Sequence, residues 1–153
     1  MSIELKKANE YEKAEQEKIP VEEKPAFHVA APVGWINDPN GFSWYQGQIH
    51  LFYQYHPYTT EWGPMHWGHS VSDDMIHWKN MPSVLAPDQE YDKRGCFSGS
   101  AVEKDGKHVL IYTGVSNVQM ENGSIQERQN QCIAYGDGEI YAVSYTHLRA
   151  HET

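Results

Sequence analysis

At 153 residues the chain is long enough to form one ordinary domain with its own hydrophobic core. Its formal net charge of −9 argues against a nucleic-acid-binding surface, which needs clustered Lys and Arg. Cys96 and Cys132 lack a paired-ligand spacing and are expected to be buried small residues rather than zinc ligands or a disulfide framework. No apolar run is long enough to cross a membrane and no secretory signal is recognisable, so a cytoplasmic protein without a membrane partner is expected.

Residues 3 to 18 are predicted to form a leading helix, because small and apolar residues recur at every third position among Glu and Lys. These positions are Leu5, Ala8, Tyr11 and Ala14. Pro20 and Pro25 then end the helix and form an extended connector. Residues 1–25 are therefore interpreted as a helix and linker that precede the main domain, residues 26–142.

From Phe27 onward the pattern changes to short segments rich in aromatic and β-branched residues, which predicts an all-β, antiparallel domain. Tight hairpin turns are expected at Gln46-Gly47 and at Asp105-Gly106. The predicted strands are residues 41–45, 49–55, 66–72, 98–103, 108–113 and 131–135.

A weak internal repeat relates residues 49–55 to residues 107–113, each following a glycine-containing turn. Two copies of one meander favour successive blades of a β-propeller, although a sandwich also consists of short strands separated by turns. Two copies cannot close a propeller, so the domain is expected to be incomplete.

Asp38 is the candidate catalytic residue, in the segment Trp35-Ile36-Asn37-Asp38-Pro39-Asn40-Gly41. Proline removes a backbone donor and Asn-Gly favours positive φ, so a tight turn is predicted to present this carboxylate. A carboxylate held rigidly among aromatic residues suits covalent attack on a sugar carbon. The alternative is that Asp38 only caps its own turn.

This segment resembles the nucleophile motif of glycoside hydrolase family 32, with Ile36 where Met is common. The family includes invertases, bacterial sucrose-6-phosphate hydrolases, inulinases and levanases. Three further segments resemble the family's next motifs in order. They are Phe52–Pro57, with His56 where Asn is usual, Trp62–Ser72, and Phe97–Val102.

The resemblance implies the first two blades or so of a five-bladed β-propeller, without the C-terminal β-sandwich of the family. It implies that Asp38 is the nucleophile and that seven residues bind substrate. These are Trp35, Ile36, Asn37, Gln54, Trp62, Phe97 and Ser98. Amides and hydroxyls suit the sugar hydroxyls and an aromatic ring suits an apolar sugar face, but Gln54 and Ser98 could equally be strand polar groups and Trp62 a core residue.

The expected partner is a small-molecule substrate: sucrose, sucrose-6-phosphate or another β-fructoside. The family's chemistry needs no metal or other cofactor, and the nearby histidines are interpreted as core or surface residues rather than ligands. These histidines are His56, His66, His69 and His77.

The family's Arg-Asp-Pro and Glu-Cys motifs, which carry a stabilising Asp and the acid/base Glu, do not occur in this chain. The chain alone is therefore expected to be inactive. Residues 143–153 resemble a translated sequencing-library adapter and are interpreted as a non-native tail. The open alternatives are a non-catalytic fructoside-binding module, an inactive gene-model fragment, and a fructan hydrolase or fructosyltransferase as the parent protein.

Overall fold

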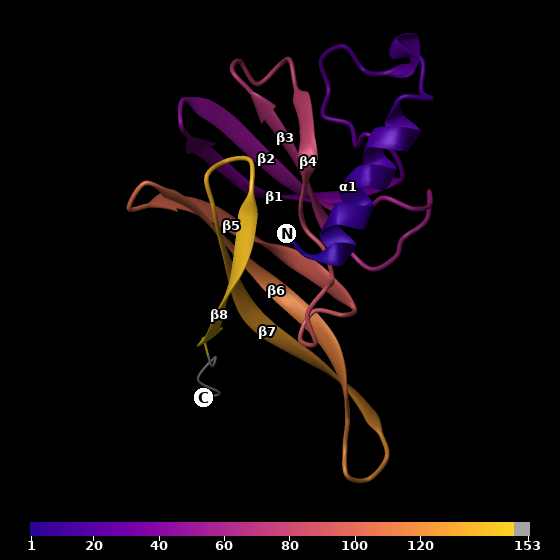
Figure 1. Cartoon of the computed structure of the whole chain (residues 1–153), viewed down its shortest axis with the longest axis vertical. Helices are drawn as coiled ribbons and strands as arrows, with labels where there is room; N and C mark the ends of the chain where they lie inside the picture. The colour runs from indigo at the N-terminus through magenta and orange to yellow at the C-terminus, as the bar shows by residue number, and fades with distance from the viewer. Residues whose placement is uncertain (149–153) are drawn as a thin grey trace.

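The computed structural model describes residues 1–148, which form two four-stranded antiparallel sheets and a short N-terminal helix (Figure 1). Sheet A has the strand order β1-β2-β3-β4, and sheet B has the order β5-β6-β7-β8. The elements are α1 (Ile3–Gln16), η1 (Val21–Glu23), β1 (Trp35–Tyr45), β2 (Gln48–His56), β3 (His66–Ser72), β4 (Lys79–Leu85), β5 (Gly95–Lys104), β6 (Lys107–Gln119), β7 (Ile125–Gly136) and β8 (Tyr141–Leu148). The predicted all-β character and leading helix are confirmed.

Both predicted hairpin turns are confirmed by their backbone angles. Gln46 and Gly47 have φ values of 48° and 79°, and Asp105 and Gly106 have values of 52° and 74°. Positive φ at both central residues gives a turn whose twist matches that of the flanking strands. The first strand pair of each sheet is therefore fixed in register by its own loop.

Two strands were not predicted. β4 contains Asn80 and Pro82, which weigh against a strand, but β4 lies at the edge of sheet A, where a proline costs no ladder hydrogen bond. β8 pairs antiparallel with β7 at the edge of sheet B. Residues 143–148 of the predicted non-native tail thus belong to β8, and the last five lie outside the described residues. The origin of the tail stays a prediction.

The two sheets pack against each other through one hydrophobic core, and β5 contacts three strands of sheet A. Both cysteines are free and buried, as predicted. The core residues are Phe52, Trp67, Val84, Leu85, Cys96, Leu110, Tyr112, Cys132, Ala134 and Tyr141. This packing fixes the position of β5 relative to β1, which places the candidate site.

A buried polar network crosses the contact between the sheets. In sheet A, His50 Nδ1 lies 2.9 Å from His69 Nε2. In sheet B, His108 Nδ1 lies 2.7 Å from the Tyr141 hydroxyl, and its Nε2 lies 2.8 Å from the Ser43 hydroxyl of β1. Burial lowers the pKa of all three histidines, that of His108 to about 4. These rings are therefore neutral core groups near neutral pH.

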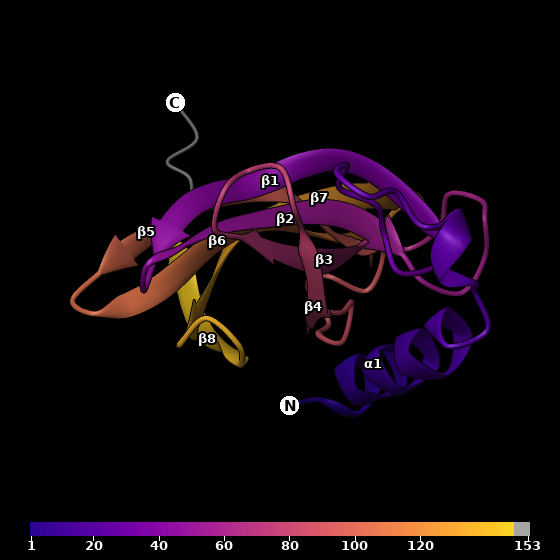
Figure 2. The ribbon, with the colours of Figure 1, turned by 90° about the horizontal axis from the view of Figure 1, so that it is seen from above.

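Helix α1 lies beside β4 (Figure 2). Ser2 caps it, because the Ser2 hydroxyl accepts a hydrogen bond from Leu5 N. Leu5 and Ala8 are buried as the sequence pattern predicts, but Ala14 is exposed and Glu12 is buried instead. The face toward the sheet therefore follows positions 5, 8 and 12, which is the spacing of a true helical stripe.

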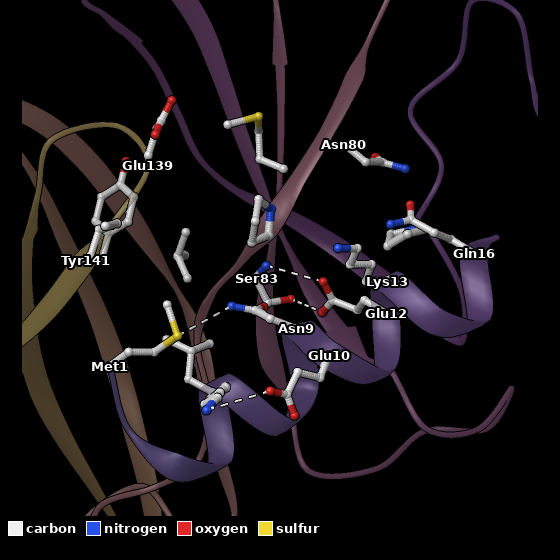
Figure 3. Close-up of a pocket in the computed structure, with 17 residues that line it drawn as sticks. Met1, Asn9, Glu10, Glu12, Lys13, Gln16, Asn80, Ser83, Glu139 and Tyr141 are labelled. Carbon is white, nitrogen blue, oxygen red and sulfur yellow. Dashed lines mark hydrogen bonds and ion pairs between the residues drawn. The ribbon is translucent and has the colours of Figure 1, made fainter.

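Glu12 is held by Ser83 of β4 beside a groove of about 630 Å³ between α1, β4 and Tyr141 (Figure 3). The Ser83 hydroxyl donates to Oε1, and Ser83 N donates to Oε2 over 3.4 Å. Burial raises the pKa of Glu12 to about 7, and the Ser83 hydrogen bonds only partly oppose this rise. The carboxyl group is therefore mostly protonated in the folded protein below about pH 7.

We expect Glu12→Gln to reduce the loss of stability at alkaline pH. Because the folded pKa is about 7 and the ordinary value is 4.5, the contribution of Glu12 is fully present below 4.5 and is lost as pH rises through 7. The variant should gain about 3 kcal/mol relative to wild type between pH 4 and pH 9. Urea unfolding across this range measures the gain, and Glu10→Gln, on the exposed face, is the control. Parallel pH profiles of stability for Glu12→Gln and wild type would contradict this expectation.

Candidate active site

Asp38 lies within strand β1, not in a tight turn between strands as predicted. The ladder with β2 shifts register between Ile36 and Pro39 and again between Asn40 and Ser43. Asp38 therefore sits in an irregular stretch of an edge strand, where turn-forming residues are tolerated. Asn-Gly does give the positive φ that was expected, since φ is 56° at Gly41.

Both oxygens of the exposed Asp38 carboxylate accept a hydrogen bond. Asn37 Nδ2 donates to Oδ1 over 2.9 Å, and the Ser98 hydroxyl donates to Oδ2 over 2.5 Å. Ser98 belongs to β5 in sheet B, so the two sheets together orient this group. The structure thus joins three of the predicted site residues directly.

An irregularity in β5 determines where Ser98 points. The register with β6 shifts between Phe97 and Gly99, so Ser98 lies at a bulge. A side chain at Gly99 would meet the backbone oxygen of Ile111 at 1.9 Å, so only glycine fits there. The Phe97 carbonyl accepts a hydrogen bond of 3.1 Å from Trp67 Nε1, which anchors the bulge to sheet A. The Ser98 hydroxyl is thereby held at Asp38.

The other predicted substrate residues lie at different depths. Gln54 is only 3% exposed, and its Nε2 donates to the Cys96 carbonyl over 2.9 Å, which links β2 to β5. Trp35 and Phe97 are half-buried, whereas Ile36 is exposed. The structure therefore places Gln54 as a support beneath the strands. Contact of these four residues with substrate stays a prediction.

Trp62 lies outside the strands, in the segment of residues 57–65 that connects β2 to β3. Its side chain is 52% exposed, so it is not the core aromatic residue that the sequence left as an alternative. An exposed indole ring offers an apolar face of the kind that stacks on a sugar. Both ends of the 57–65 segment lie at the end of sheet A where β1 begins, because His56 pairs with Trp35 and His66 pairs with Tyr55.

Asp92 supports the site but was missed from the sequence. It is fully buried, and it accepts hydrogen bonds from Gln89 N over 2.7 Å and from the Tyr112 hydroxyl over 3.0 Å. Burial raises its pKa to about 6. Asp92 thus fixes the loop that leads into β5 and Ser98. The sequence around Asp92 carries no signal for Tyr112, which lies 20 residues further on in β6.

Within residues 1–148, no group of three or more His, Cys, Asp and Glu residues is arranged to hold a metal ion. Two of the histidines considered from the sequence, His56 and His66, both direct Nδ1 to the Pro64 carbonyl, at 3.3 Å and 3.0 Å. Burial lowers the pKa of His66 to about 4. The part of the chain that the structure describes also has no helix long and apolar enough to cross a membrane.

Residues 28–150 match the family model of the glycosyl hydrolases family 32 N-terminal domain. The chain therefore belongs to glycoside hydrolase family 32. A sucrose-6-phosphate hydrolase of Escherichia coli is 54% identical over 110 residues, which are 72% of this chain and 23% of that enzyme. A sucrose-6-phosphate hydrolase of Zymomonas mobilis is 45% identical over 131 residues, covering 85% of this chain and 25% of that one. The chain thus spans about a quarter of the length of these curated relatives.

The fold also matches solved structures of the family. A family 32 β-fructofuranosidase of Bombyx mori has a TM-score of 0.80 at 38% identity, over 94% of this chain and 30% of that one. An aspartate-to-alanine mutant of the Bombyx enzyme, in complex with sucrose, has a TM-score of 0.78 at 36% identity, over 96% and 30%. These relatives are glycoside hydrolases, and one of them binds sucrose.

Proposed function

We propose that this chain is the N-terminal part of a retaining β-fructofuranosidase that cleaves sucrose or sucrose-6-phosphate. The observation that carries the proposal is the exposed Asp38 carboxylate, held by Asn37 from its own strand and by Ser98 from the other sheet. Two hydrogen bonds leave the carboxylate with free lone pairs in a fixed direction. The names of the bacterial relatives support the choice of substrate.

In the proposed reaction an Asp38 oxygen forms a bond to the anomeric carbon of the fructosyl unit while the bond to the leaving sugar breaks. The leaving oxygen takes a proton from a second carboxyl group, roughly 5 Å from the first in retaining enzymes. Water then cleaves the fructosyl ester and restores the Asp38 carboxylate. Attack by another sugar in place of water would make the parent a fructosyltransferase.

The two sheets are proposed to be the first two blades of a five-bladed propeller, and further sequence is needed to supply the acid/base Glu and the stabilising Asp. The chain alone is therefore proposed to be inactive. A cytoplasmic location stays a prediction. Sequencing the source DNA across codon 142 tests the proposed end of the native sequence, and uninterrupted genomic coding of residues 143–153 would refute it.

The test is a hydrolysis assay on the complete protein that carries this chain, with sucrose and sucrose-6-phosphate as substrates. We expect fructose or its phosphate to be released from at least one of them. No release from either substrate would contradict the proposed function. Calorimetry on the 153-residue chain tests the second candidate, a fructoside-binding module, which is favoured only by binding without turnover.

A further inference from the structure

The 57–65 segment, which carries Trp62, is attached to both sheets close to the candidate active site. It leaves β2 at His56, which pairs with the first residue of β1. It ends at Met65, whose carbonyl accepts a hydrogen bond of 2.8 Å from Cys96 N at the start of β5. The segment therefore starts and finishes within a few residues of the strands that hold Asp38 and Ser98.

Helix α1 contacts this segment at Tyr58. The Tyr11 hydroxyl donates to the Tyr58 carbonyl over 3.3 Å, and the two rings meet edge to face with their centroids 5.1 Å apart. Lys7 Nζ lies 5.8 Å from the centre of the Tyr58 ring. Edge-to-face rings and a cation over a ring both attract through the ring quadrupole. Two residues on one face of α1 thus hold the first part of the segment.

The Tyr58 ring also contacts the two histidines that flank the segment, and both of these lie close to the Pro64 carbonyl. It contacts the rings of His56 and His66 edge to face, at 5.7 Å and 5.8 Å between centroids. Nδ1 of each histidine lies within 3.3 Å of the carbonyl oxygen of Pro64. A side chain at Gly63 would meet the His56 ring at 2.6 Å, so the backbone packs directly on that ring.

We propose that α1 is a brace for the substrate site, and that Tyr11 is a positioning residue that acts through Tyr58 to hold Trp62 in place for the fructosyl unit. This inference rests on the proposed function. Trp62 lies between the restrained Tyr58 and the restrained Gly63-Pro64, and its own ring is exposed. A loose segment would present that ring in many orientations. Its ordering on binding would then cost conformational entropy and weaken the affinity for substrate.

Tyr11→Ala in the complete protein tests the brace. If the ring stacks on the sugar in both the bound substrate and the transition state, its loss removes uniform binding, which raises KM and keeps kcat. We expect KM for the cleaved fructoside to rise about threefold to tenfold and kcat to change by less than about twofold. Tyr135→Ala, which removes a partly exposed tyrosine from β7, should leave both constants unchanged. A fall in kcat with KM unchanged would overturn the proposal.

A double mutant decides whether Tyr11 acts through Trp62. If it does, Tyr11→Ala should have no further effect on KM once Trp62→Ala is present. Multiplication of the two single effects would overturn the proposal, because it would make the residues independent.

Hydrogen exchange of the same proteins separates this inference from the proposed function. Tyr11→Ala should speed exchange in residues 57–65 and leave residues 108–113 of β6 unchanged. If the wild-type protein cleaves no fructoside, the proposed function fails together with the substrate role of Trp62, while faster exchange in 57–65 still supports the brace. Unchanged exchange in 57–65 overturns the brace whatever the activity.

Discussion

Asp38→Asn in the complete protein should lower kcat for fructoside hydrolysis by about 10⁴-fold or more, as expected when a covalent nucleophile is removed. An amide has the shape of the carboxylate and can still accept a hydrogen bond from the Ser98 hydroxyl, but it cannot form the fructosyl ester. The substitution should therefore abolish chemistry and leave substrate binding largely intact. Steady-state hydrolysis and calorimetric binding of sucrose measure the two effects separately.

Asp73→Asn is the matched control for this prediction. Asp73 is also exposed, but it lies in the turn after β3, where its carboxylate accepts a hydrogen bond from Gln48. Its substitution should leave kcat within about twofold of wild type, since exposed polar changes rarely have large effects. Equal activity of Asp38→Asn and Asp73→Asn would rule out Asp38 as the nucleophile.

Gly99→Ala should destabilise the fold by about 3 kcal/mol or more, because the new methyl group would overlap backbone rather than a side chain. The Cβ atom would lie 1.9 Å from the Ile111 oxygen and 2.8 Å from Tyr112 Cα. Relief requires β5 to move away from β6, which breaks the pairing beside Ser98. Activity should fall with stability, since Ser98 then no longer reaches Asp38.

Gly47→Ala provides the comparison for Gly99. A Cβ atom added at Gly47 would meet nothing within 4 Å. The only cost of the substitution is the positive φ of 79°. That cost is about 1–2 kcal/mol. Denaturant unfolding of both variants in the complete protein measures the difference. If Gly99→Ala were no less stable than Gly47→Ala, the close approach of Gly99 to β6 at the bulge that places Ser98 would be contradicted.

The sequence correctly predicted those elements whose residues have a local preference for the structure that they form. The two hairpin turns and the leading helix follow from turn residues and spacing over a few positions. Two differences from the prediction have one cause: Pro39 and Pro82 are residues that usually interrupt strands, yet both lie in edge strands, where proline is tolerated. Which strands lie at an edge is a property of the whole sheet, so the sequence alone does not reveal it.

The candidate site could be predicted only in part. Asp38 and Asn37 are neighbours in the chain, but the bond from Ser98 joins two sheets across 60 positions of sequence. Resemblance to the family placed Asp38 and Ser98 in one pocket, whereas no local sequence pattern does. Gln54 was expected in that pocket as well; the structure shows that it is buried because β2 is covered on both faces, and its contact with substrate stays a prediction. Alternation along a strand cannot distinguish one covered face from two.

Covalent trapping of the complete protein with a slowly hydrolysed fructosyl substrate tests whether the Asp38 carboxylate forms a bond to fructose. We expect one fructosyl adduct per chain, and peptide mass spectrometry should place it on the Asp38 side chain. The label should be absent from Asp38→Asn and present in Asp73→Asn. A label on any other residue, or an unreduced yield in Asp38→Asn, would contradict the claim that this carboxylate forms the bond to fructose.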